Sequence, residues 1–375
     1  MSKQQVSFFW FRRDLRLEDN VGLFHALKSK YTVIPLFIFD DAILDSLPYN
    51  DPRVGFIYEN LSKINTQLLK IESALLVKKG KTLAVWELLL TEFDIKEVFF
   101  NKDYEPYAIK RDSAICELLE TNNAIPFSFK DQVIFEEKEI TKADGLPYTV
   151  YTPFKNKWLE KYKSMAPVLE YDATDVFSNF HKCDFVFPSL EQIGFEKSPI
   201  KVKPHNLKFI ANYQDIRDFP ALDQTSYLSP HLRFGTVSIR KLVNWAFHKN
   251  DVFLSELIWR EFFMQILFSF PKVVTQNFKT AYDGIKWRNN EADFQRWCSG
   301  TTGYPMVDAG MRQLNETGYM HNRVRMVAAS FLCKHLLIQW QWGEAYFAQK
   351  LLDYDLSANV GNWQWAAGTG CDAAP

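Results

Sequence analysis

Strand-like and helical segments alternate through the first 130 residues of this sequence, and after Pro204 the strand-like segments stop. The first two predicted strands, residues 6–11 and 31–39, are nearly continuous apolar runs rich in β-forming residues, as in a parallel sheet that is buried on both faces. This alternation predicts an open, mostly parallel α/β sheet with right-handed crossovers. The other expected elements are strands 74–77, 95–100 and 125–129 and helices 53–71, 82–93 and 106–121.

No glycine-rich phosphate motif accompanies these strands. Neither GxGxxG nor GxxxxGK[ST] occurs with them, so the Rossmann-like pattern alone predicts neither a dinucleotide nor a nucleoside triphosphate. A scaffold domain is at least as good an interpretation of this region as a cofactor site.

The regular pattern breaks between residues 131 and 203. Prolines recur there and the polar stretches lack a period, which indicates a long connector between domains, with one helical piece at residues 154–163. From residue 204 to 375, apolar spacing of 3.6 residues predicts an all-α domain. Its expected helices are 209–219, 239–248, 252–268, 292–298, 306–317 and 321–342, the last being the longest, with Asp251 as a cap and Gly235, Gly318 and Gly343 at helix ends. We therefore predict domains at 1–130 and 204–375 joined by the connector 131–203.

Composition excludes several classes of protein. Apolar residues make up 47% and charged residues 24% of the chain, which is typical of a soluble globular protein. The formal net charge of −1 means that any binding of nucleic acid must use a local basic patch. The five scattered cysteines lack CxxC spacing and indicate a reducing compartment without a zinc site or a disulfide framework. With no signal-like leader and no apolar run of membrane-spanning length, we expect a cytoplasmic protein.

Tryptophan is concentrated in the second half of the chain, where most of the 11 tryptophans lie after residue 240. Trp363 and Trp365 belong to a segment rich in Gly, Ala and Asn, a composition that makes a poor core strand or helix but a good wall of a site. Asp353 and Asp355 lie just upstream. We therefore expect the chemistry of this protein between Tyr304 and Pro375.

Two further motifs carry groups suited to an anionic, planar ligand. Thr225–Ser229 places three Ser and Thr hydroxyls ahead of a predicted helix, which suits phosphate, although such clusters are usually caps or turns. Glu256 and Arg260 share one helix face with Trp259 beside them. This group is either a surface ion pair next to a core tryptophan or a charged, aromatic wall presented to a ligand.

The segment His321–Met326 forms a third motif. Asn322, Arg325 and Met326 share a helix face, and Arg325 could pair with Asp353. Taken singly, the histidine is more often structural and the methionine more often core filler. Together, the amide, the two arginines and the methionine suit contact with bases and phosphates.

With Trp10–Asn20 and Thr302–Pro305, these motifs resemble the photolyase/cryptochrome family, and within it class I cyclobutane pyrimidine dimer photolyases. The resemblance covers nearly the whole chain, and the combined motifs are highly specific. It implies an α/β antenna domain, a helical FAD-binding domain and a lyase that repairs UV-damaged DNA, in which photoexcited reduced FAD donates an electron to the dimer. The alternatives are a cryptochrome-like blue-light photoreceptor without repair activity and a non-catalytic DNA-binding remnant.

The resemblance also implies which residues hold FAD. Asn359 would face the flavin N5, and Arg325 would neutralise Asp353. The full predicted set is Tyr213, Thr225, Ser226, Tyr227, Leu228, Ser229, Asn322, Arg325, Asp353, Tyr354, Asp355 and Asn359.

A second implied set binds the lesion and moves electrons. Glu256 could stabilise negative charge on a carbonyl oxygen of the dimer, and three tryptophans would form a relay from the flavin to the surface. The predicted DNA and lesion contacts are Arg217, Glu256, Trp259, Arg260, Asn322, Arg323, Met326 and Trp365, and the predicted catalytic residues are Glu256, Asn359, Trp363, Trp340 and Trp287. No metal is implied, and we expect a monomer.

The sequence departs from the family pattern in two places. Tyr104-Glu105 is followed by Pro106, Tyr107 and Ala108 where folate-binding members carry an Asn-Glu pair, so the sequence disfavours a folate antenna and leaves another second chromophore, or none, open. Family members also continue past the position of Asp372 with a Tyr-Phe-Arg motif, so we expect either a fragment or an FAD domain without its C-terminal end. Within the family, Asn322 and Met326 follow the cyclobutane pattern and not that of the (6-4) enzymes.

Overall fold

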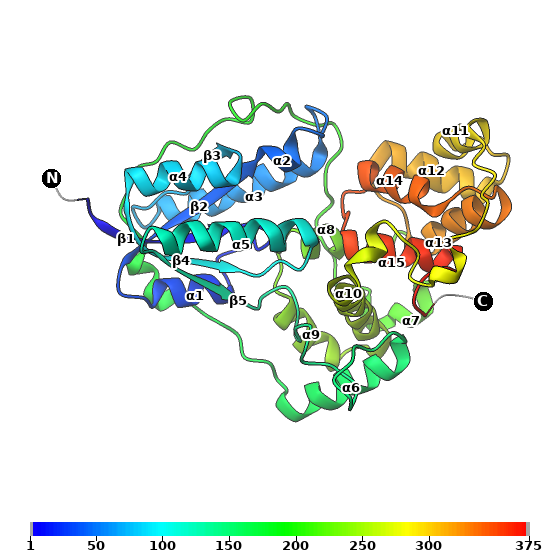
Figure 1. Cartoon of the computed structure of the whole chain (residues 1–375), viewed down its shortest axis with the longest axis horizontal. Coiled ribbons are helices and arrows are strands. Elements are labelled where there is room, and N and C mark those ends of the chain that lie inside the picture. Colours follow the sequence, from blue (N-terminus) through cyan, green and yellow to red (C-terminus); the bar gives the residue numbers. More distant parts are fainter. Residues whose placement is uncertain (1–2, 373–375) are drawn as a thin grey trace. The chain divides into compact units, whose positions relative to one another are not determined.

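The computed structural model describes residues 3–372 (Figure 1). The chain forms two compact units, neither of which is continuous in sequence. The predicted connector, 131–203, is divided between them. The first unit consists of Met1–Ile134, Leu169–Val202 and Phe234–Leu242, and the second of Phe135–Val168, Lys203–Arg233 and Val243–Pro375.

The first unit is built on a parallel sheet with strand order β3-β2-β1-β4-β5. The predicted α/β class is therefore confirmed. Its strands are β1 (Gln5–Phe11), β2 (Thr32–Asp40), β3 (Leu76–Gly80), β4 (Asp94–Asn101) and β5 (Ile125–Phe129), and its helices are α1 (Val21–Leu27), α2 (Asp41–Leu44), α3 (Pro52–Leu69), α4 (Thr82–Glu92) and α5 (Pro106–Thr121), with a 3-10 turn at Thr174–Asn179.

The central strand β1 supplies apolar side chains to both faces of the sheet. Phe9 and Phe11 belong to one core cluster, with residues of α1 and α3, whereas Phe8 and Trp10 belong to another, with residues of α4 and α5. Because successive side chains of a strand point to opposite faces, a strand that is covered on both sides must be apolar at nearly every position. This explains the continuous apolar run in the sequence.

A buried ionic network follows β1 in this unit. Both oxygens of Asp131 accept hydrogen bonds from Arg16 at 2.8 Å, and Oδ1 also accepts one from Arg240 at 2.8 Å. Arg240 Nε donates to Asp19 at 3.0 and 3.1 Å. Burial raises the pKa of Asp131, but the two guanidinium groups outweigh it, so that the net shift is downward and the carboxylate stays charged.

The second unit contains helices and no extended strand among residues 3–372, which confirms the all-α class (Figure 1). Helices α10, α13 and α14 all pack against α15. The helices are α6 (Tyr151–Met165), α7 (Tyr213–Ile216), α8 (Leu228–Arg233), α9 (Ile239–Phe247, shared with the first unit), α10 (Asp251–Ser269), α11 (Glu291–Ser299), α12 (Pro305–Thr317), α13 (Asn322–Ser330), α14 (Trp340–Lys350) and α15 (Leu356–Ala367), with 3-10 turns at Ile210–Asn212, Pro271–Val274 and Thr280–Tyr282.

The predicted long helix 321–342 is wrong. Helix α13 ends at Ser330, a π-helical turn follows at Phe331–His335, and α14 starts only at Trp340. Leu337, which follows the π-helical turn, has a φ of 54°, and a residue in this left-handed conformation cannot continue a right-handed helix toward α14. Apolar spacing continues across this break, which is why the pattern reads as one helix. The longest described helix is α10, with 19 residues.

The segment around Trp363 forms a helix, α15, although we expected its composition to make a poor core helix. Asp355 caps α15 by accepting a hydrogen bond from the Ala358 N–H at 3.2 Å. Gly361 allows close packing against α10, because a Cβ there would lie 2.1 Å from the Phe263 ring. The low helix propensity of glycine is thus offset by packing that only glycine permits.

Two predicted helix boundaries also need correction. Asn250, and not Asp251, caps α10, since its side chain accepts from the Phe253 N–H at 2.9 Å. Gly343 lies inside α14, where a Cβ would come within 2.1 Å of Trp363. Gly318 does end α12 in the left-handed conformation, as predicted.

Candidate functional site

A charged and aromatic face lies on α10 in the helical unit. Arg217, at the end of α7, donates from Nη1 to Glu256 Oε1 at 2.7 Å. The Arg217 guanidinium also lies 5.3 Å from the centre of the Tyr213 ring, within the range of a cation–π contact. The side chains of Arg217 and Glu256 remain 19% and 29% exposed. The predicted site residues Tyr213, Arg217 and Glu256 are therefore brought together at a surface that a ligand can reach.

Trp259 lies one turn further along the same helix. Its ring stacks on Tyr151, with centroids 3.6 Å apart and planes 9° from parallel. Trp259 is half-buried, whereas Tyr151 is buried. Tyr151 was not among the predicted site residues, because nothing in the sequence separates it from the other aromatic residues of the connector.

The start of α13 presents several predicted residues. Arg323 pairs with Asp218 at 2.6 Å, and its Nη1 lies 3.4 Å from the Met326 sulfur. Asn322 is exposed beside them. His321 is a cap whose Nδ1 accepts from the Arg323 N–H at 3.2 Å, and burial lowers its pKa. The histidine of this motif is thus satisfied structurally.

Arg325 and Asp353 form the expected ion pair. Nη1 and Nη2 of Arg325 donate to the two carboxylate oxygens at 3.1 and 2.8 Å, and Nε donates to the Met320 carbonyl at 2.8 Å. Asp355, two residues on, is approached by Arg233 Nη1 at 3.5 Å. Arg233 was missed by sequence reasoning, because its distance from Asp355 along the chain hides the pairing. Both aspartates are thus held by arginines of the same unit.

Asn359 is oriented by Glu344 of α14. Its Nδ2 donates to Glu344 Oε1 at 2.9 Å and to the Glu344 carbonyl at 3.1 Å. Burial raises the pKa of Glu344. Since the amide nitrogen is used in this way, the carbonyl oxygen is the group that Asn359 can offer to a ligand. Glu344 was also missed, because a single glutamate in a helix carries no signal of its burial.

The segment Thr225–Ser229 contains a buried hydroxyl without a hydrogen bond. Thr225 Oγ1 lies near the Tyr319 hydroxyl, but it makes no hydrogen bond of good geometry within residues 3–372. Tyr227 has a φ of 51° and accepts from Lys203 Nζ at 2.9 Å through its hydroxyl. Buried polar atoms of folded proteins almost always have a partner, so the Thr225 hydroxyl indicates a place where a polar ligand group fits.

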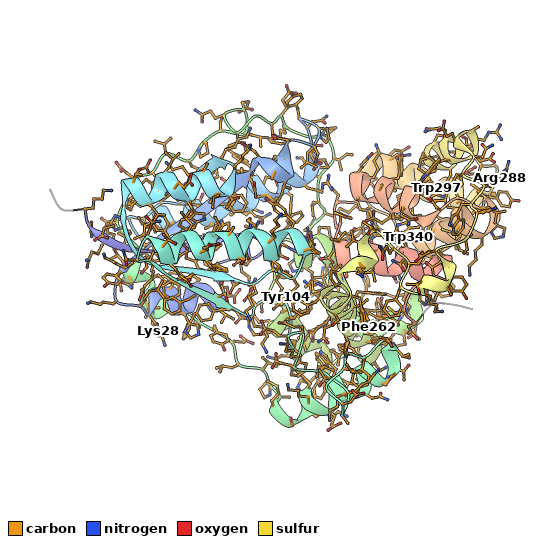
Figure 2. All side chains as sticks on the ribbon, in the orientation of Figure 1. Lys28, Tyr104, Phe262, Arg288, Trp297 and Trp340 are labelled. Carbon is orange, nitrogen blue, oxygen red and sulfur yellow. The ribbon has the colours of Figure 1, made fainter. Side chains whose placement is uncertain are left out.

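The three predicted relay tryptophans belong to one core cluster. Trp363 and Trp340 are buried, and Trp287 is partly buried. Trp340 Nε1 donates to Asn277 at 2.8 Å. The ring of Trp363 contacts Phe347 at 5.0 Å and Trp297 at 6.0 Å between centroids. Figure 2 labels Trp297 and Trp340, both inside the helical unit. Trp297 was not predicted.

The remaining predicted residues lie nearby on the same elements. Trp365 is partly buried and packs against the tryptophan cluster. Arg260 follows Trp259 on α10 and is half-buried. The hydroxyl of Tyr354 donates to Glu344 Oε1 at 3.4 Å. Leu228 begins α8 and is buried, with Ser226 Oγ accepting from its N–H at 3.4 Å, and Ser229 is exposed.

Family comparisons match both halves of the chain. A model for DNA photolyase matches residues 7–174, and a model for the FAD binding domain of DNA photolyase matches residues 253–375. This chain belongs to the DNA photolyase family. The predictions of a photolyase enzyme and of FAD as its cofactor are therefore confirmed, as is the family resemblance.

Similar proteins of known function and similar solved structures support the same family. The deoxyribodipyrimidine photo-lyase of Halobacterium salinarum is 36% identical over 99% of this chain and 84% of its own length, and that of Escherichia coli is 35% identical over 98% and 82%. The archaeal photolyase of Sulfolobus tokodaii, solved with two FAD molecules, has a TM-score of 0.81 at 35% identity over 98% of this chain and 84% of its own. The cryptochrome of Synechocystis matches with a TM-score of 0.81 at 24% identity, over 100% of this chain and 84% of its own, which shows a shared fold only.

The arrangement of this photolyase fits FAD. The Thr225 hydroxyl, which makes no hydrogen bond of good geometry among the described residues, suits a polar group of the cofactor, and the fixed Asn359 amide offers an acceptor. Among residues 3–372, no helix is long and apolar enough to cross a membrane. Tyr104 is buried, and Glu105 pairs with Arg13 at 3.0 Å in the α/β unit.

Proposed function

We propose that this photolyase splits cyclobutane pyrimidine dimers in damaged DNA. The observation that carries the proposal is the face of α10, where the Glu256 carboxylate is held by Arg217 at 2.7 Å and stays partly exposed beside Trp259. A flipped pyrimidine pair needs a flat surface on which to stack and polar groups at its carbonyl edges. Trp259 and Glu256 supply both from one helix.

The residues proposed to contact the lesion supply different kinds of interaction. Trp259 and Trp365 offer aromatic area for stacking. Arg217 and Arg323 supply positive charge for phosphates next to the lesion. Asn322 and Met326 lie at the start of α13, and the resemblance assigns this pair to the cyclobutane enzymes and not to the (6-4) enzymes. The Glu256–Arg217 pair stabilises the charge that develops on a dimer carbonyl oxygen, with the guanidinium supplying the positive charge.

The residues proposed to bind FAD can be grouped by the part of the cofactor that they would contact. Tyr213 and Thr225–Ser229 would hold the phosphate side of FAD, and Asp353, Tyr354 and Asp355 would hold the ribose and isoalloxazine side. Asn359 would offer its carbonyl oxygen to the flavin ring and tune its redox states. Bound FAD, reduced and excited by light, supplies the electron that opens the dimer. Trp363, Trp340 and Trp287 carry electrons to oxidised flavin from the surface.

Repair of defined lesions tests the proposal. Chemically reduced protein is mixed with one oligonucleotide carrying a cyclobutane dimer or with another carrying a (6-4) photoproduct, and both are exposed to blue light. We expect only the cyclobutane dimer to be restored. Restoration of the (6-4) lesion alone would contradict the proposed substrate. A protein with a flavin absorption spectrum that repairs neither lesion would instead be a photoreceptor. Monomeric state and location in the cytoplasm stay predictions.

A further inference from the structure

Trp259 is held in place by aromatic neighbours on several sides. Tyr151 of α6 covers one face, with centroids 3.6 Å apart, and Phe262 meets the ring edge-on at 5.6 Å. Phe263 lies at 5.5 Å, 28° from parallel. A half-buried tryptophan would otherwise sample several rotamers. These contacts oppose a change of rotamer.

Tyr151 is itself fixed to α10. Its hydroxyl donates to the Ser255 carbonyl at 2.7 Å and lies 2.6 Å from Ser255 Oγ, one residue before Glu256. Its backbone N–H donates to the Asp372 carboxylate at 3.4 Å. The side chain is only 6% exposed. The stack therefore couples Tyr151 to the part of α10 that carries both Glu256 and Trp259.

A second contact, based on Glu261, holds α6 against α10. The buried Glu261 carboxylate accepts from Trp158 Nε1 at 2.7 Å and from the Phe135 N–H at 3.0 Å. Tyr151 lies about two helical turns from Trp158. Because α6 is anchored in this way, the Tyr151 ring is a rigid support and not a mobile cover.

We propose that Tyr151 is a positioning residue for lesion recognition. By covering one face of Trp259, it leaves the remaining exposed part of the indole for the flipped base and sets its orientation before DNA binds. A side chain that is already immobilised loses less conformational entropy on binding. The proposal rests on the proposed function, since it assigns Trp259 to the lesion.

The test measures the affinity of the FAD-loaded protein for DNA with and without one cyclobutane dimer, at equal length and salt. Tyr151→Phe keeps the stack and loses the hydroxyl, so its affinity for the lesion should match that of the wild type. Tyr151→Leu removes the flat face and should bind the lesion about 3- to 10-fold more weakly, the range expected for one newly mobile side chain. Affinity for undamaged DNA should not change, nor should the repair rate at saturating DNA.

Tyr162 of the same helix provides a matched control. It stacks on Trp158 at 5.1 Å and 13° from parallel, and it is likewise buried. Tyr162→Leu therefore removes a similar Tyr–Trp stack and should reduce stability without changing lesion affinity. Tyr151→Met, whose flexible side chain fills irregular gaps in a core, replaces Tyr151→Leu if the latter does not fold.

Two results would overturn the positioning role. In the first, the Tyr151→Leu or Tyr151→Met protein binds the lesion as the wild type does. In the second, the Tyr162→Leu protein loses lesion affinity to the same extent. If the wild type itself shows no preference for dimer-containing DNA, the proposed function fails. This outcome is therefore distinct from a failure of the positioning role of Tyr151.

Discussion

The two units both place arginines against carboxylates, but to different extents of burial. In the α/β unit, the side chains of Arg16, Asp131, Arg240 and Asp19 are at most 8% exposed. In the helical unit, Arg217 and Glu256 are 19% and 29% exposed. The buried network has its carboxylate oxygens occupied by protein donors, whereas the open pair can still bind a ligand. We therefore expect similar residue types to serve structure in one unit and, under the proposed function, recognition in the other.

Asp131→Ala should give the largest effect and test the structural half of this comparison. It leaves two buried guanidinium groups without their shared partner, and breaking a buried pair costs about 3–5 kcal/mol. The free energy of unfolding from urea denaturation measures the loss. Glu18→Gln is the control, because Glu18 pairs with Lys241 but is 76% exposed and should cost less than about 1 kcal/mol. If Asp131→Ala lost as little unfolding free energy as Glu18→Gln, the network would not be needed for stability.

Glu256→Gln tests the recognition half. We expect an unchanged free energy of unfolding and a repair rate reduced about 10- to 100-fold, since a hydrogen bond to a charged group contributes about 1.5–3 kcal/mol. Single-turnover repair by chemically reduced protein measures the rate. Glu160→Gln, at an exposed ion pair of α6, should repair normally. Equal losses of stability in both Glu256→Gln and Asp131→Ala would remove the distinction between the two regions.

Trp363→Phe separates electron supply from repair within the helical unit. Phenylalanine keeps an aromatic ring in the core but is much harder to oxidise than indole. Photoreduction of oxidised flavin should slow by about tenfold or more, equivalent to about 1.4 kcal/mol of barrier. Repair by pre-reduced protein should persist. Trp365→Phe should spare photoreduction and weaken lesion binding. Unchanged photoreduction in Trp363→Phe would exclude Trp363 from the relay.

Glu344→Gln should give the smallest effect, seen in the pH dependence of stability. Burial raises the pKa of Glu344 in the folded protein, so between the ordinary carboxyl pKa of about 4.3 and the raised value the folded state binds more protons than the unfolded state. Its stabilisation is complete below the ordinary pKa and is lost as pH rises through the raised pKa. The difference in unfolding free energy between wild type and variant, followed from acid to neutral pH, isolates this group. A difference that does not change with pH would contradict the shift.

Much of the fold could be predicted because its signals are local. The apolar runs of β1 and β2 and the periodicity of α4 and α5 depend on residues close together in the chain. The α/β class followed from their alternation, and the family followed from short motifs such as His321–Met326. These features can be recognised in the sequence without knowing how the side chains pack.

Tertiary structure decided the features that join distant segments. Arg217 pairs with Glu256, Glu344 orients Asn359, and Tyr151 supports Trp259, in each case across a loop or between helices. No periodicity in the sequence encodes such contacts, because the energy that selects them arises only when the helices pack.

Helix boundaries also depend partly on local sequence and partly on tertiary packing. Sequence alone determined that residues 321–342 have apolar residues with a helical period, but a π-helical turn and the left-handed Leu337 separate α13 from α14. Composition argued against a helix at Trp363, yet the close contact of Gly361 with Phe263 favours one. Local propensity differs by about 1 kcal/mol between glycine and alanine in a helix, and burying one large side chain contributes about 1.5–3 kcal/mol. Packing therefore determines the conformation wherever the two disagree.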